Sequence, residues 1–221
     1  MATVTDIRRS GPAFRRRTIV LDGEGWRDVP ASLLAVLDLE VSAEVDADEL
    51  AARIEAAEPK LARERAIRLI TAKERSRAGL AGRLVQDGFS SQVSESTADD
   101  LLRIGLVDDE RFANALARTL ARVRGTGRER IARELRDAGV AEDVAVTALD
   151  GALDPEQERE AALHLARSAA ARSGATVDRV AARLVRRGYR PAVALTAARE
   201  ALEGSAGEPW ESALNPDADD D

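Results

Sequence analysis

Three stretches of this chain align without a gap: "LAGRLVQDGFSSQVSEST" (residues 80–97), "IARELRDAGVAEDVAVTA" (131–148) and "VAARLVRRGYRPAVALTA" (180–197). Each has an aliphatic residue, a leucine four positions later, and a glycine after four more positions that an apolar residue follows. The i, i+4 spacing is typical of the buried face of a helix. A glycine at that place can take the left-handed conformation that ends a helix, and the next apolar side chain packs against the last turn. We therefore expect three copies of one helical unit.

The expected fold is mainly α, with three tandem three-helix repeats in an elongated, curved stack behind a small N-terminal β-hairpin and helix segment. One repeat is too small to bury its apolar face alone, so neighbouring repeats should stack. The expected domains are a flexible arm (1–14), the N-terminal hairpin and helix segment (15–58), three-helix repeats at 59–105, 106–152 and 153–203, and a disordered acidic tail (204–221).

Local signals predict where several of these elements begin. "RRTIVLDGEGWRDV" (16–29) has two strand-like runs around a turn-forming "DGEG", which predicts the hairpin. Three acid- or threonine-led capping boxes predict helix starts, and a proline at the first helical position strengthens one of them. Separate helices are expected at 46–57 and 59–73, and one helix at 108–123. The capping boxes are Asp46 with Glu49, Thr126 with Glu129, and Asp154 with Gln157.

The composition excludes several classes of protein. The chain has no cysteine, which excludes disulfides, thiolate catalysis and cysteine zinc sites. No apolar run has the length of a membrane span and no signal peptide is recognisable, so we expect a cytoplasmic protein. His164 is the only histidine and is interpreted as a packed or half-exposed helix residue. We expect no catalytic residues, no metal and no cofactor, and hence no enzyme.

The net charge of −7 hides an uneven distribution along the chain. Residues 1–58 carry −5, residues 59–203 carry +4 and residues 204–221 carry −6. On an ideal helix from Asp108, an apolar sector about 80° wide faces the core, and a stripe of arginines lies clear of it. The apolar residues of that sector are Phe112, Leu116, Leu120 and Val123.

The arginines of the second and third repeats are the candidate partner-binding residues. They can contact carboxylates or phosphates of a partner, or form a solvated surface with i, i+4 pairs such as Arg130 with Glu134. The candidates are Arg111, Arg118, Arg122, Arg124, Arg128, Arg130, Arg133 and Arg136, with Arg186, Arg187 and Arg190 in the third repeat.

Two motifs resemble the RecX family of RecA recombinase regulators: "GLVDDERFA" (105–113) and "GRERIARELRDAGV" (127–140). The resemblance covers about residues 15–203 and includes the tandem three-helix repeats. Two positions depart from the family pattern: Arg128 replaces a proline and Ala138 replaces a lysine. The second departure leaves open one basic contact that the resemblance implies on that helix.

The resemblance implies a non-catalytic protein that binds in the groove of the RecA filament on single-stranded DNA. It also implies inhibition of strand exchange, ATP hydrolysis and the co-protease activity of the SOS response, and thus a role in DNA repair and recombination. We expect a monomer, with possible weak direct DNA binding.

Two other classes stay open on the residues alone. A direct DNA-binding module fits the short helices around glycine turns, although the acidic flanks would repel phosphate. A helical scaffold for an unrelated protein partner also fits the repeats.

Overall fold

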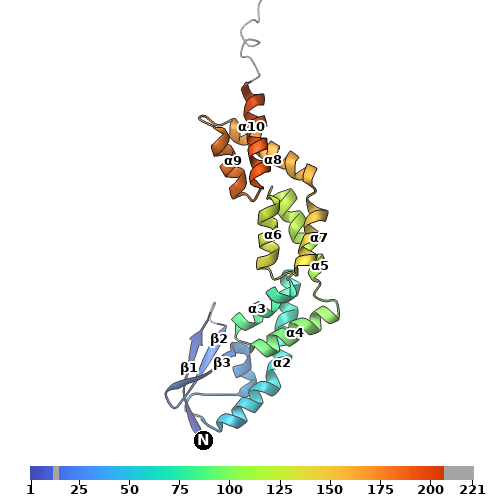
Figure 1. Ribbon diagram of the computed structural model, residues 1–221. Coiled ribbons are helices and arrows are strands. Elements are labelled where there is room, and N and C mark those ends of the chain that lie inside the picture. Colours follow the sequence, from blue (N-terminus) through green and yellow to red (C-terminus); the bar gives the residue numbers. More distant parts are fainter. Residues whose placement is uncertain (12–14, 207–221) are drawn as a thin grey trace, which may run out of the picture. The chain divides into compact units, whose positions relative to one another are not determined.

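A computed structural model describes the protein over residues 1–11 and 15–206 (Figure 1). Within these residues the fold is mainly α, with a small sheet formed by residues near the N-terminus. The chain divides into two compact units. Unit 1 contains Met1–Phe112 with Ala138–Val140, and unit 2 contains Ala113–Asp137 with the chain from Ala141 onward. No helix of the described chain has the length and apolar character needed to cross a membrane.

The N-terminal sheet contains the predicted hairpin and two strands that were not predicted. Strands β2 (Arg16–Leu21) and β3 (Glu24–Pro30) form the hairpin, and the sheet order is β3-β2-β1-β4. Strand β1 (Ala2–Ser10) pairs antiparallel with β2, and the short β4 (Glu44–Val45) pairs with β1. The flexible arm predicted for residues 1–14 is therefore wrong over Ala2–Ser10, while residues 12–14 lie outside the described chain.

A single core explains why β1 is ordered. Val4 of β1 and Ile19 of β2 are fully buried, in a cluster with Leu33 of helix α1 (Ala31–Leu37). The polar residues of β1 hide this pattern in the sequence, because only one side of the strand meets the cluster. Burial of apolar surface therefore orders strand β1, whose conformation the preferences of its own residues do not determine.

Helix α2 is one continuous helix over Ala47–Ala72, so the prediction of two helices separated near Pro59 is wrong. An internal proline removes one helical hydrogen bond and costs about 3 kcal/mol. The helix is buried on both sides of Pro59: Ile54 belongs to the core under the sheet, and Ala62 belongs to the core of the first repeat. This burial on both sides offsets the cost of the proline. Asp46 caps the helix as predicted and accepts hydrogen bonds from the amides of the first turn.

The predicted three-helix units are present. The second half of α2 packs with α3 (Arg77–Asp87) and α4 (Ser91–Arg103). The second three-helix repeat has α5 (Asp109–Arg118), a π-helical turn η2 (Thr119–Val123), α6 (Arg128–Asp137) and α7 (Glu142–Ala152). The third has α8 (Pro155–Ala170), α9 (Val177–Arg186) and α10 (Pro191–Ala206). Residues 204–206 of the predicted tail belong to α10, and residues 207–221 lie outside the described chain.

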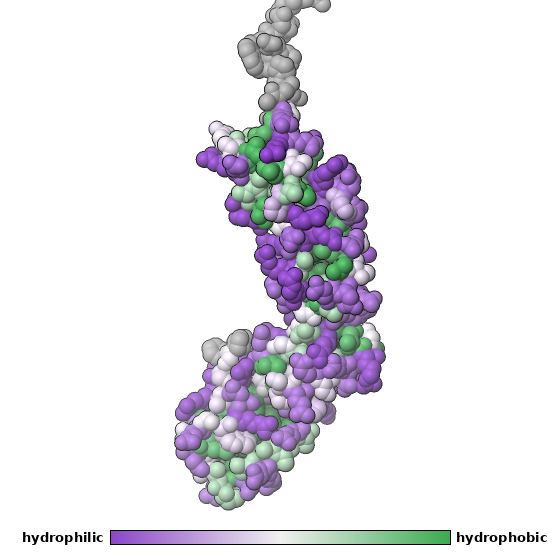
Figure 2. Space-filling view, viewed as in Figure 1, coloured by the Kyte–Doolittle hydropathy of each residue, from purple (hydrophilic) through white to green (hydrophobic). Residues whose placement is uncertain are grey.

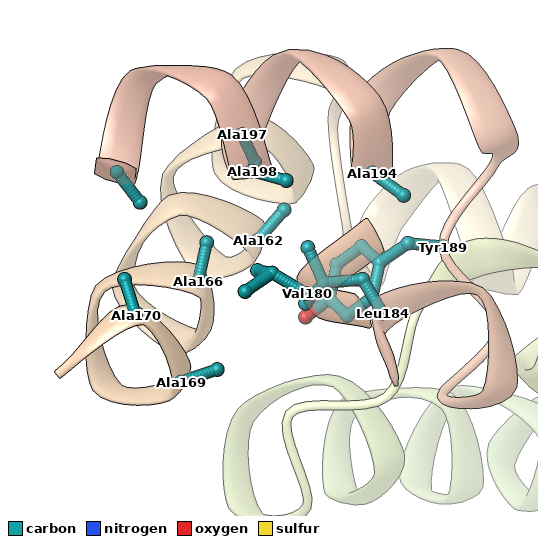
Figure 3. Packing of buried hydrophobic residues seen from close by; sticks show 11 residues of the cluster. Ala162, Ala166, Ala169, Ala170, Val180, Leu184, Tyr189, Ala194, Ala197 and Ala198 are labelled. Atoms are coloured by element: carbon teal, nitrogen blue, oxygen red, sulfur yellow. The ribbon is translucent and has the colours of Figure 1, made fainter. Parts of the chain in front are cut away.

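The three repeated glycines confirm the alignment that predicted the fold. Gly88, Gly139 and Gly188 have φ values of 104°, 72° and 91° at the ends of α3, α6 and α9. The apolar residues that follow, Phe89, Val140 and Tyr189, are buried. Alanines dominate the core of the third repeat, and Figure 3 shows those of α8 and α10 on both sides of Val180 and Leu184. Small side chains let these helices approach closely.

The helix expected at 108–123 winds differently at its end. Asp108 caps it and accepts a hydrogen bond from the Arg111 amide at 2.8 Å. After Arg118 the helix widens into η2, where the Arg124 amide donates to the Thr119 carbonyl. The extra residue in this turn rotates the following side chains. Val123, predicted to face the core, is therefore 80% exposed, whereas Ala121 is buried.

Candidate functional site

In unit 2, the glycine turn of the third repeat docks on the beginning of α6. The Gly127 amide donates to the Arg187 carbonyl at 3.0 Å, and the Glu129 amide donates to the Gly188 carbonyl at 2.9 Å. The first amides of a helix have no partner within it and need acceptors. The turn of the neighbouring repeat supplies these acceptors, so the capping box predicted for Thr126 and Glu129 is wrong.

A buried glutamate completes this junction. Glu158 of α8 is 1% exposed and accepts a hydrogen bond from the Arg128 amide at 3.2 Å. Its second carboxylate oxygen is 3.0 Å from the Arg190 guanidinium. A buried carboxylate is stable only when it is paired and hydrogen-bonded. Glu158 therefore joins the beginning of α6 to the turn before α10.

Three of the candidate arginines contribute to the same junction through their side chains. Arg190 pairs with Glu158, and Arg187 donates to the Arg124 carbonyl at 3.3 Å. The half-buried Arg128 forms an ion pair with Asp150 and donates to the Leu153 carbonyl at 3.2 Å. These intramolecular contacts give the three side chains a role in holding helices together.

The same arrangement occurs in unit 1, at the beginning of α3. Ser76 donates to the Ala138 carbonyl, and the Asp109 carboxylate accepts from the Arg77 amide at 2.7 Å. A side chain on Gly139 would overlap Ala78. In both junctions a glycine turn meets the beginning of the second helix of the preceding repeat. The sequence analysis explained these glycines by φ alone, although the small residues opposite them, Ala78 and Gly127, were a signal of close approach.

The remaining candidate arginines are exposed. Arg111 lies in unit 1, where its guanidinium is 2.6 Å from Glu74, and this hydrogen bond raises the pKa of Arg111. Arg130 pairs with Glu134 at 3.5 Å, which is the predicted i, i+4 pair. The other exposed candidate arginines have no side-chain hydrogen bond or ion pair within the described chain, and we call them the unpaired arginines. They are Arg118, Arg122, Arg124, Arg133, Arg136 and Arg186. In Figure 2, hydrophilic residues cover the surface over α6.

A groove in unit 2 brings some of these arginines together. Its volume is about 680 Å³, and it is lined by residues of η2, of the turn after it and of α8. Arg122, Arg124 and Arg187 supply positive charge, and the exposed Val123 lies beside them. His164 is exposed and lies at the same groove. The apolar lining residues are Ala121, Ala152, Leu153, Ala161 and Leu165. Within the described chain, no three side chains of the metal-binding types are grouped to hold a metal ion.

Two family models match the repeats. Residues 62–101 match the first three-helix domain of RecX, and residues 108–149 match its second three-helix domain. Relatives named regulatory protein RecX are similar over most of their length. The one from Mycobacterium ulcerans is 40% identical over 139 residues, which cover 60% of this chain and 80% of the relative. The one from Corynebacterium efficiens is 38% identical and covers 64% and 71%.

Solved structures support the fold. A crystal structure of regulatory protein RecX aligns with a TM-score of 0.59 and 23% identity, over 92% of this chain and all of the solved chain. The structure of RecX from Lactobacillus salivarius aligns with the same TM-score and 19% identity, over 66% and 97%.

Proposed function

This chain belongs to the RecX family of regulatory proteins, and we propose that it binds the RecA filament on single-stranded DNA and limits its activity. The inhibited activities would be strand exchange, ATP hydrolysis and the co-protease function, in the cytoplasm, with the protein acting as a monomer. The proposal assigns it no catalytic step of its own.

The unpaired arginines are the observation that supports this proposal. A guanidinium presents several donors in a rigid plane and binds carboxylates or phosphates through two parallel hydrogen bonds. Acids or backbone carbonyls already engage five of the candidate side chains: Arg111, Arg128, Arg130, Arg187 and Arg190. The unpaired arginines have no such contact in the described chain, so their donors are available to a partner.

The locations of the unpaired arginines suggest which four residues a variant should replace. Arg118 and Arg122 lie on α5 and η2, and Arg133 and Arg136 lie on α6. All four are exposed. Their replacement by glutamate removes attraction and adds repulsion toward an acidic partner, yet it breaks no side-chain hydrogen bond or ion pair within the described chain. Surface substitutions of this kind change the free energy of unfolding by less than about 0.5 kcal/mol each.

The test is the RecA ATPase activity on single-stranded DNA, with and without this protein. We expect the wild type to inhibit, and the Arg118→Glu, Arg122→Glu, Arg133→Glu, Arg136→Glu variant to lose inhibition while it keeps its helicity. The matched control reverses four other exposed arginines that have no hydrogen-bond or ion-pair partner in the described chain: Arg63, Arg68, Arg167 and Arg199. Equal loss in both variants would show a bulk charge effect, and full inhibition by the first variant would contradict the proposal.

Direct DNA binding is the second candidate, because exposed guanidinium groups suit phosphates as well as carboxylates. It predicts binding to bare single-stranded DNA that weakens steeply as salt rises. Filament binding instead needs RecA, so a salt titration with DNA alone separates the two functions.

A further inference from the structure

The groove of unit 2 is lined by both apolar residues and arginines, and a ligand that binds there must match both. Part of its lining is apolar, with Ala161 and Leu165 of α8 and with Val123, which is 80% exposed. Three guanidinium groups, of Arg122, Arg124 and Arg187, lie among the same lining residues. A ligand that fits both carries apolar side chains and carboxylates on one short segment.

This chain contains a segment of that composition. Residues 207–221, "GEPWESALNPDADDD", have six acidic residues and no basic one. The same segment carries Trp210 and Leu214, whose side chains suit the apolar lining residues. We propose that residues 207–221 bind in the groove of unit 2, with their carboxylates on the guanidinium groups of Arg122, Arg124 and Arg187.

The length of the segment permits this contact. Helix α10 packs against α8, which lines the groove, and Arg187 precedes the first residue of α10 by four positions. A return along the 16 residues of α10 covers about 24 Å. Fifteen extended residues span up to about 50 Å. The carboxylates at positions 217 and 219–221 therefore reach the arginines, with some length to spare.

Because residues 207–221 are covalently attached to unit 2, a weak contact is sufficient for them to occupy the groove. A segment tethered close to its site has an effective concentration in the millimolar range, so occupancy needs little intrinsic affinity. Ion pairs at an exposed surface are screened by salt, which makes the occupancy salt-dependent. The bound segment would cover Arg122 and Arg124, which are unpaired arginines. If the proposed function holds, the segment therefore competes with the RecA filament, and this consequence alone rests on that function.

A paramagnetic label gives a direct test on the full chain, without RecA or DNA. The sequence has no cysteine, so Ala218→Cys places a nitroxide at one position without a change of charge. At low salt we expect strong broadening of the amide signals of Val123, Gly125 and Leu165. At high salt those signals should recover. Groove signals that keep their full intensity at low salt would overturn the proposal and leave the groove to a different occupant.

Matched charge reversals test the specificity of the contact. In the labelled chain, Arg122→Glu with Arg124→Glu should abolish the broadening, whereas Arg167→Glu with Arg199→Glu should preserve it. All four side chains are exposed and have no hydrogen-bond or ion-pair partner in the described chain, and Arg187 is left in place because it donates to the Arg124 carbonyl. Equal loss of broadening in both double variants would reduce the contact to bulk charge and overturn the proposal.

A change in the segment itself keeps the test independent of the folding of the groove. Amide replacement of its six acids, at 208, 211, 217 and 219–221, should also abolish the broadening. Retained broadening in this variant would overturn the proposed role of the carboxylates. Since RecA is absent from each measurement, failure of this inference is distinct from failure of the proposed function.

Discussion

The close approach of Gly127 and Gly188 makes a quantitative prediction about the junction in unit 2. A Cβ on Gly188 would overlap the Arg130 side chain and lie 2.6 Å from the Arg130 backbone nitrogen. The φ of Gly188 is +91°, and an L-residue in this conformation carries backbone strain of about 1–2 kcal/mol. Overpacking of a tight contact costs about 1–3 kcal/mol more. Gly188→Ala should therefore lower the free energy of unfolding by about 2–5 kcal/mol.

Gly127→Ala tests the same contact from the opposite side without the strain. The φ of Gly127 is not positive, but a Cβ there would overlap the backbone of Gly188 and Tyr189. We expect a loss of about 1–3 kcal/mol from overpacking alone. Because the two substitutions disturb one contact, the double variant should cost less than the two single costs together.

Two other glycines serve as controls. Gly105 has a φ of +75° and open space around a Cβ, so Gly105→Ala should show strain alone, about 1–2 kcal/mol. Gly151, within α7, has open space and no positive φ, so Gly151→Ala should stabilise by about 0.5–1 kcal/mol. Urea denaturation measures all of these differences. Gly127→Ala without cost, or Gly188→Ala no worse than Gly105→Ala, would refute the tight junction.

Two further predictions concern buried ionisable groups at this junction. Burial raises the pKa of Tyr189 from 10.0 to about 12, with Glu158 contributing, so the fold favours the neutral phenol. The contribution of the neutral phenol to the free energy of unfolding is on the order of 2 kcal/mol in total. It is fully present below pH 10 and is lost as the pH rises toward 12. Tyr189 is the only tyrosine, so phenolate absorbance reports it directly; titration near pH 10 would contradict the burial, and Tyr189→Phe should remove the alkaline loss of stability. Glu158→Ala leaves the Arg128 amide without its acceptor, at about 1–3 kcal/mol, and should speed hydrogen exchange at that amide. Unchanged exchange would show that Glu158 does not cap α6.

The sequence by itself determined the features that depend on neighbouring residues. A glycine that ends a helix needs only its own φ and the apolar residue after it, which is why Gly88, Gly139 and Gly188 located the repeats. A cap such as Asp46, or Asp154 with its following proline, binds amides two or three residues away. Such short-range signals are complete within a window of the sequence, and they predicted the helices and the hairpin.

Only the tertiary structure decided what depends on distant partners. Strand β1 and the continuity of α2 through Pro59 follow from burial against segments far along the chain. The widened turn η2 exposes Val123, which a helical projection with constant winding places inside. Glu158 and the Gly188 turn cap α6 from another repeat, at a separation of about 30 to 60 residues. The arginines look alike in the sequence, and only the positions of acids and carbonyls around them separate those that hold the junction from those without a side-chain contact in the described chain.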